Sequence, residues 1–140
     1  MIALGIAACG GDGDDSDYRE DFQQVSERIV SLGERVQEAI ETAGDATDRE
    51  LADDFGGFAD ELSEMRQELD GLEPPDDLAD QHDQLVDAIG TVQASLDDIA
   101  KAAEQSDADA ARQATIELVE RSSDLRDARL ALARAVREED

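Results

Sequence analysis

From Tyr18 onward, apolar side chains recur every three or four residues in four successive segments. An α-helix has about 3.6 residues per turn, so side chains at this spacing share one face of a helix. The apolar stripes run from Tyr18 to Ile40, from Leu51 to Leu69, from Leu78 to Ala103 and from Ala111 to Val136. Each segment is therefore predicted to be an amphipathic helix that must bury its stripe against the others, and the fold class is all-α.

The first connection carries local helix signals. Gly44 follows the first stripe and suits a helix end, and Thr47 with Glu50 three residues later has the pattern of a capping box. At the second connection, Gly71 suits the end of a helix and Pro74-Pro75 prevents its continuation. These residues predict where the second helix begins and ends.

The third connection contains neither glycine nor proline. Continuing the register of the third stripe would place Gln113 and Glu117 in the core, whereas the apolar side chains fall at other positions. Because the register breaks, a turn is predicted there, with Ser106 or Asp107 as the N-cap of the fourth helix.

Four helices of comparable length with short connections pack most simply as an antiparallel up-down-up-down four-helix bundle, here over residues 17–140. Alternating spacings of three and four residues also fit coiled-coil association. A three-helix core and a dimer are therefore left open, and so is the oligomeric state.

The chain is strongly acidic, with 38 Asp and Glu against 12 Lys and Arg and a formal net charge of −26. Binding of nucleic acid or anionic lipid headgroups requires Lys and Arg to replace counterions, so we exclude both as direct partners. A basic protein partner fits this surface. Self-repulsion on this scale also predicts that stability rises with ionic strength.

The basic side chains are concentrated near the C-terminus. Residues 107–140 contain nine acidic side chains and six arginines, Arg112, Arg121, Arg126, Arg129, Arg134 and Arg137. The simpler interpretation is that these arginines neutralise acidic neighbours within the fold. The alternative is an arginine-bearing contact face.

Several classes of helical-bundle chemistry lack their residues here. Di-iron bundles use a Glu-x-x-His pair, but the single histidine, His82, has Ala79 at that spacing. The sequence also lacks a phosphate-binding Gly-rich loop with Lys, a Cys-x-x-Cys-His haem motif and a plausible Ser-His-Asp set. A hydrolase with two carboxylates is the weakest alternative, because solvated helix faces explain the acidic residues better. We expect no catalysis and no cofactor.

His82 and Met65 form the one arrangement that suggests a ligand site. Both lie on apolar stripes, at similar depths on either side of the Pro74 turn, so antiparallel packing would bring them to similar levels. Together they could bind haem iron or a soft metal. The alternative is structural, with His82 buried near the end of the bundle and hydrogen-bonded to Tyr18, beside a methionine that fills space.

Cys9 is the only cysteine and closes the short apolar leader of residues 1–8. Residues Ile6 to Gly10 resemble the lipobox of bacterial lipoproteins, which implies cleavage before Cys9 and lipidation of its sulfur. The leader is short for a secretory signal, which leaves an upstream translation start open. As a helix it would cover only about 12 Å of a hydrocarbon core of about 30 Å, so attachment to a membrane must pass through Cys9. Residues 9–16 are glycine-rich and acidic, and they are predicted to be a flexible tether.

The lipobox, the tether, the four stripes and the Leu-x-x-Leu-x-Pro-Pro sequence from Leu69 to Pro75 together resemble small helical lipoproteins of high-GC bacteria. The resemblance implies a lipid-anchored domain on the extracytoplasmic face of the cell membrane. The resemblance transfers no binding residues. With no catalytic constellation in the sequence, we expect an interaction or scaffold protein of the cell envelope that presents an acidic helical surface to a partner.

Overall fold

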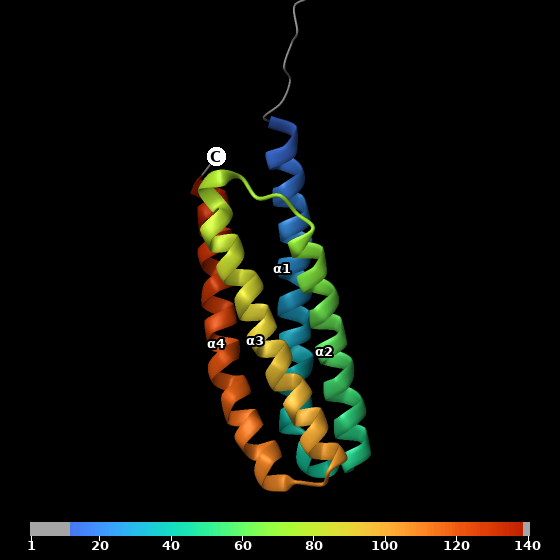
Figure 1. Cartoon of the computed structure of the whole chain (residues 1–140). Coiled ribbons are helices and arrows are strands. Elements are labelled where there is room, and N and C mark those ends of the chain that lie inside the picture. Colours follow the sequence, from blue (N-terminus) through green and yellow to red (C-terminus); the bar gives the residue numbers. More distant parts are fainter. Residues whose placement is uncertain (1–11, 139–140) are drawn as a thin grey trace, which may run out of the picture.

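The protein is described by a computed structural model that covers residues 12–138, with side chains from residue 16 onward. Four α-helices, α1 (Asp12–Glu41), α2 (Asp48–Asp70), α3 (Ala79–Glu104) and α4 (Ala108–Glu138), account for most of this range, which contains no strand. Successive helices run in opposite directions along one long axis (Figure 1). The predicted all-α, up-down-up-down four-helix bundle is therefore confirmed.

The start of α1 differs from the prediction. The helix begins at Asp12, so residues 12–16 of the predicted tether are helical. Acidic residues favour the first turn of a helix because the backbone amides there carry partial positive charge, and positions 12, 14 and 15 are all Asp. The predicted signal peptide, residues 1–8, and Cys9 lie outside the described residues.

The connection between α1 and α2 contains a short 3-10 helix, Ala43–Asp45, followed by the predicted capping box. The Glu50 amide donates to Thr47 Oγ1 at 3.1 Å, and the Thr47 amide donates to a Glu50 carboxylate oxygen at 3.0 Å. Two amides that a helix start leaves without intrahelical partners are thereby satisfied.

The connection between α2 and α3 also follows the sequence signals. Gly71 is the C-cap of α2, and a second 3-10 helix, Asp76–Leu78, leads into α3 after the two prolines. At the α3–α4 connection, the Ala110 amide donates to Asp107 Oδ1 at 3.0 Å, so Asp107 is the N-cap of α4. Of the two candidates, Asp107 caps the helix and Ser106 occupies the turn before it.

The four predicted stripes meet in one continuous core. Every stripe residue is buried or half-buried, and none is exposed. The largest fully buried side chains lie in α2, α3, α4 and the turn before α3, and they include Phe55, Leu62, Leu69, Leu78, Leu85, Ile89, Leu96, Leu118 and Leu132. Burial of these side chains supplies the main driving force for the fold.

The helices do not approach one another equally. α3 packs closely along both α2 and α4, whereas α1 approaches its neighbour α2 less closely and its other neighbour α4 less closely still. Exposed ion pairs connect α1 to α2, with Arg28 on Glu68 at 2.7 Å and Arg35 on Glu61 at 2.5 Å. The bundle therefore has one loosely packed side, where α1 faces α4.

Candidate binding groove between α1 and α4

A groove of about 790 Å³ opens along the loosely packed side. We call it the α1–α4 groove. Its walls are the facing sides of α1 and α4, and its floor is formed by Leu62 of α2 and by Val92 and Leu96 of α3. The wall residues are Ile29, Val30, Leu32, Gly33, Glu34, Val36, Gln37, Ile40 and Glu41 of α1, and Leu118, Val119, Ser122, Ser123, Leu125, Arg126 and Arg129 of α4. Most of this surface is apolar.

Small side chains keep the groove open. Gly33 contributes no side chain on the α1 wall, and a Cβ atom added there would meet nothing within 4 Å. Ser122 and Ser123 hold the corresponding stretch of the α4 wall. At the edges, the side chains of Val30 and Val119 are 43% and 60% exposed, although both are apolar. An exposed apolar strip above an apolar groove is typical of a binding surface.

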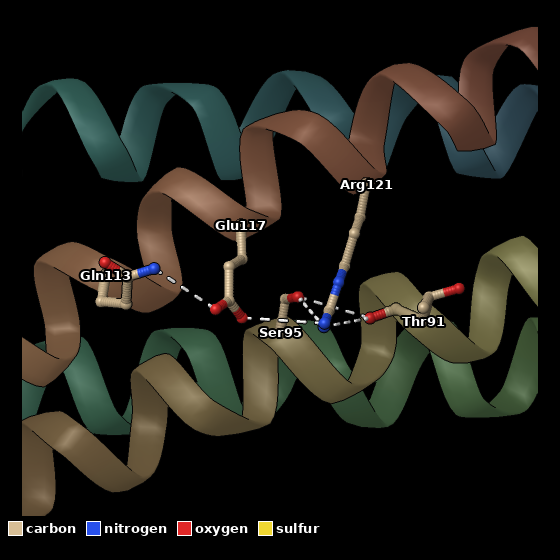
Figure 2. Close-up of polar contacts among 5 residues, drawn as sticks. All are labelled: Thr91, Ser95, Gln113, Glu117 and Arg121. Atoms are coloured by element: carbon tan, nitrogen blue, oxygen red, sulfur yellow. Dashed lines mark hydrogen bonds and ion pairs between the residues drawn. The ribbon is translucent and has the colours of Figure 1, made fainter.

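Arg121 explains why the apolar stripe of α4 is interrupted between Leu118 and Leu125. Its guanidinium turns toward α3, where Nη1 donates to Ser95 Oγ at 2.7 Å and to the Thr91 carbonyl at 3.4 Å (Figure 2). Glu117 of α4 lies 3.7 Å from the same guanidinium, and the Ser95 side chain is fully buried. Arg121 thus joins α4 to α3 with polar contacts and leaves the α1–α4 side without a large apolar side chain at that level.

Two other arginines of α4 face the groove. Arg126 and Arg129 both line it, and Arg129 donates from Nη1 to Ser26 Oγ of α1 at 3.2 Å. In residues 16–138, no ion pair within 4.0 Å joins an α4 arginine to an acidic side chain of another helix. Among residues 16–138, the arginines of α4 therefore do not neutralise the other helices through direct pairs, and Arg126 and Arg129 line the groove instead.

His82 has the structural environment of the predicted alternative. Its ring is 4% exposed, and Nδ1 lies 2.8 Å from the Tyr18 hydroxyl of α1. Burial raises the pKa of the Tyr18 phenol, so the hydroxyl keeps its proton and donates to Nδ1. The Leu69 backbone also favours the protonated ring and so acts against the effect of burial on the pKa of His82. The predicted Tyr18–His82 hydrogen bond is confirmed.

The protonation of His82 follows from this environment. Desolvation by burial lowers the pKa of His82, while Asp83, the Leu69 backbone and Asp70 oppose the shift in part. The imidazole is therefore neutral at pH 7, with Nδ1 engaged in the hydrogen bond to Tyr18. A nitrogen that accepts a hydrogen bond has no lone pair left for a metal.

Met65 does not complete a ligand pair with His82. It is 2% exposed and borders a shallow depression on the α1–α2 side with Arg28, Ser31 and Arg35, whereas His82 contacts Leu69, one helical turn further along α2. Among residues 12–138, no group of three or more His, Cys, Asp or Glu side chains is placed to hold a metal ion. The geometry thus favours the structural role of His82 and Met65 over haem or metal binding.

The sequence reasoning did not find the groove. The groove has three signals: the missing apolar side chain at Arg121, the small residues on two facing helices, and the lack of an ion pair at Arg126 and Arg129 among the described side chains. The first of these is readable in the sequence, whereas the other two depend on which helix faces which.

No helix in the described range is both long and apolar enough to cross a bilayer. Comparison of the chain with protein-family models, with curated proteins and with solved structures finds no match.

Proposed function

We propose that this protein is a non-enzymatic binding module, held on the extracytoplasmic face of the cell membrane by a lipidated Cys9, and that it binds through the α1–α4 groove. The observation that supports this proposal is the groove itself. A four-helix bundle of this length can close all four sides, yet here apolar side chains of α1 and α4 face an open space of about 790 Å³. That volume is within the range of about 300 to 1,000 Å³ common for ligand sites.

The position of the groove suits a module anchored at Cys9. Ile29, the first groove residue of α1, lies 17 residues beyond Asp12, which corresponds to about 25 Å along the helix axis. The acidic bundle would therefore hold its binding surface away from the headgroups. An anchor at the N-terminus would also leave the whole length of the groove accessible.

Site-specific photo-crosslinking in envelope fractions tests the binding site. A benzophenone amino acid at Val30, at the edge of the groove, is expected to capture a bound component. The same benzophenone amino acid in place of Gln84, which is exposed on α3 and away from the groove, is the matched control. It should capture less of the bound component. Equal capture at both positions would contradict binding in the groove.

A pair of glycine substitutions adds a second control. Gly33→Leu places a side chain on the groove wall, whereas Gly57→Leu places one on the exposed surface of α2. Neither added Cβ meets a heavy atom within 4 Å, so both chains should fold. Loss of the Val30 crosslink in Gly33→Leu alone supports the groove as the site.

Fractionation tests the anchor separately. The wild-type protein is expected in the membrane fraction and the Cys9→Ala variant in the soluble fraction. Mass spectrometry of the wild-type protein should show an acylated cysteine at its N-terminus. The same distribution for both proteins, or an unmodified thiol, would refute lipid anchoring.

As a second interaction, the acidic surface outside the groove is proposed to bind a basic protein partner. It is supported by the −26 charge and by α2, where exposed carboxylates include Asp53, Asp54, Asp60, Glu64 and Asp70. Capture of such a partner should weaken with salt and be unaffected by Gly33→Leu. Capture that is insensitive to salt would exclude this interaction.

A further inference from the structure

We propose that the α1–α4 groove binds a long-chain fatty acid, with the hydrocarbon chain between its apolar walls and the carboxylate at Arg126 and Arg129. This inference rests on the proposed function of the groove as a binding site. It adds the chemical class and the orientation of the ligand.

The volume of the groove favours a slender chain. The floor reaches the middle of the bundle at Leu62 and Leu96, which remain only 1% exposed although they line the groove. The wall side chains therefore cover the floor almost completely, and a bound chain would lie between the walls, above Leu62 and Leu96. An α-helix with side chains is about 10 to 12 Å wide and, over the length of the groove, fills more than its volume of about 790 Å³, whereas a hydrocarbon chain does not.

The length of the groove also suits an extended chain. The lining residues of α1 run from Ile29 to Glu41, a rise of about 18 Å along the helix axis. Apolar residues line this whole stretch, at Leu32, Val36 and Ile40 on α1. Transfer of a hydrocarbon chain from water to such a surface contributes favourably with each methylene buried.

The charges of the groove define the orientation. Arg129 donates a hydrogen bond to Ser26, so the guanidinium groups of Arg126 and Arg129 lie toward the end of the groove nearest Ser26. Glu34 and Glu41 line the α1 wall further along the helix, with Glu41 fifteen residues beyond Ser26, or about 22 Å. A carboxylate at the Ser26 end meets two arginines, whereas at the Glu41 end it would meet a like charge.

The arginines are available for this role. Neither has an ion pair with a carboxylate within 4.0 Å among residues 16–138, although the chain carries a large excess of acidic groups. Arg129 has a neutral hydroxyl partner, and Ser122 and Ser123 lie on the same wall. Guanidinium groups bind carboxylates with strong, charge-assisted hydrogen bonds.

Calorimetric titration of the purified protein with palmitate, below its micelle concentration, tests the inference. Palmitate is expected to bind with one site per chain. Hexadecanol, which has the same chain length but no charge, should bind about tenfold more weakly or worse, because the charge-assisted hydrogen bonds are lost. Equal affinities for the two probes would refute the role of the arginines.

Variants locate the site. Arg126→Gln with Arg129→Gln should weaken palmitate about tenfold or more and leave hexadecanol unchanged. Arg134→Gln with Arg137→Gln removes two arginines of the same helix outside the groove and should have no effect. Gly33→Leu should weaken both probes, and Gly57→Leu neither. Palmitate binding that survives Gly33→Leu would place the ligand elsewhere and overturn the inference.

The Val30 crosslink separates this inference from the proposed function. Capture of a fatty acid from envelope fractions supports both. Capture of a protein or a phospholipid at Val30, without palmitate binding, retains the binding site and refutes the fatty acid. Absence of both capture and palmitate binding refutes the inference and the proposed function together.

Discussion

The hydrogen bond between Tyr18 and His82 connects α1 to α3 inside the bundle. Both side chains occupy stripe positions and are almost fully buried. A buried polar group destabilises a fold unless it finds a partner, and here the hydroxyl of Tyr18 and Nδ1 of His82 satisfy each other. This contact helps to hold α1, the helix that packs least closely against the rest.

Tyr18→Phe tests the contribution of this bond. The variant keeps the aromatic ring and leaves His82 Nδ1 buried without its donor, so the free energy of unfolding should fall by about 1 to 3 kcal/mol. Urea denaturation measures the change. In a His82→Leu background the same substitution should cost much less, because no acceptor is left unsatisfied. An equal cost in both backgrounds would show that the bond does not contribute.

The lowered pKa of His82 predicts a pH dependence of stability. The unfolded chain has a histidine pKa near 6.5 and the folded chain a lower one, so below pH 6.5 the unfolded state takes up the proton first. The stabilisation from neutral His82 is complete above pH 6.5 and decreases as the pH falls toward the folded pKa. Wild-type stability should therefore decline between about pH 7.5 and 5.5 by more than that of His82→Leu. Parallel pH profiles for the two proteins would contradict the prediction.

Individual site residues differ in how far the sequence reveals them. Tyr18 and His82 could be paired from the sequence, because both lie on apolar stripes at the same end of an antiparallel bundle. Arg126 and Arg129 could not be assigned to the groove, because their surroundings depend on side chains of α1 that are distant in sequence. The interruption of the apolar stripe at Arg121 is visible in the sequence. The contact of Arg121 with Ser95 could not be predicted, because it depends on how α3 packs against α4.

Among the elements, the α3–α4 connection shows how a helix can end without glycine. Ser106 has a φ of 52°, in the left-handed region, and its amide donates to the Ala103 carbonyl at 3.0 Å. The Asp107 amide donates to the Ala102 carbonyl at 2.9 Å. These two bonds form a Schellman motif, in which glycine usually occupies the position of Ser106 because a Cβ atom disfavours this conformation.

Ser106→Gly should therefore stabilise the protein by about 0.5 to 1 kcal/mol, because the backbone strain of a non-glycine residue is removed. Chemical denaturation with urea gives the difference in free energy. Ala94→Gly, at an exposed position inside α3, is the matched control and should destabilise by about 1 kcal/mol, since glycine is unfavourable in a helix interior. A loss of stability in Ser106→Gly would show that the serine side chain has a role of its own.

The elements were largely predictable, since caps and stripes are local signals. The capping box at Thr47, the helix end at Gly71 and the N-cap at Asp107 are all as predicted. The start of α1 was not, because a glycine- and aspartate-rich stretch fits a flexible tether and a helix N-terminus equally well. The α1–α4 groove was also missed, because periodicity assigns a buried face to each helix but does not determine how closely two faces meet.

In the whole molecule, repulsion among the excess acidic side chains competes with attraction within a few ion pairs. The net charge of −26 destabilises the compact state through self-repulsion. The ion pairs Arg28–Glu68 and Arg35–Glu61 attract α1 to α2, but their side chains are 42% to 51% exposed. Exposed pairs contribute about 0 to 1 kcal/mol each, so two of them cannot offset repulsion summed over the whole surface.

Screening should therefore stabilise the protein, and the melting temperature should be higher in about 1 M NaCl than in about 50 mM. Most of the increase is expected below about 0.2 M, where the Debye length falls to the spacing of neighbouring surface charges. Arg28→Gln with Arg35→Gln removes the attractive pairs and makes the charge more negative, so its melting temperature should be lower at low salt and rise more steeply. A wild-type melting temperature that is unchanged or lower at high salt would mean that local attraction, concentrated where α1 meets α2, outweighs the net charge.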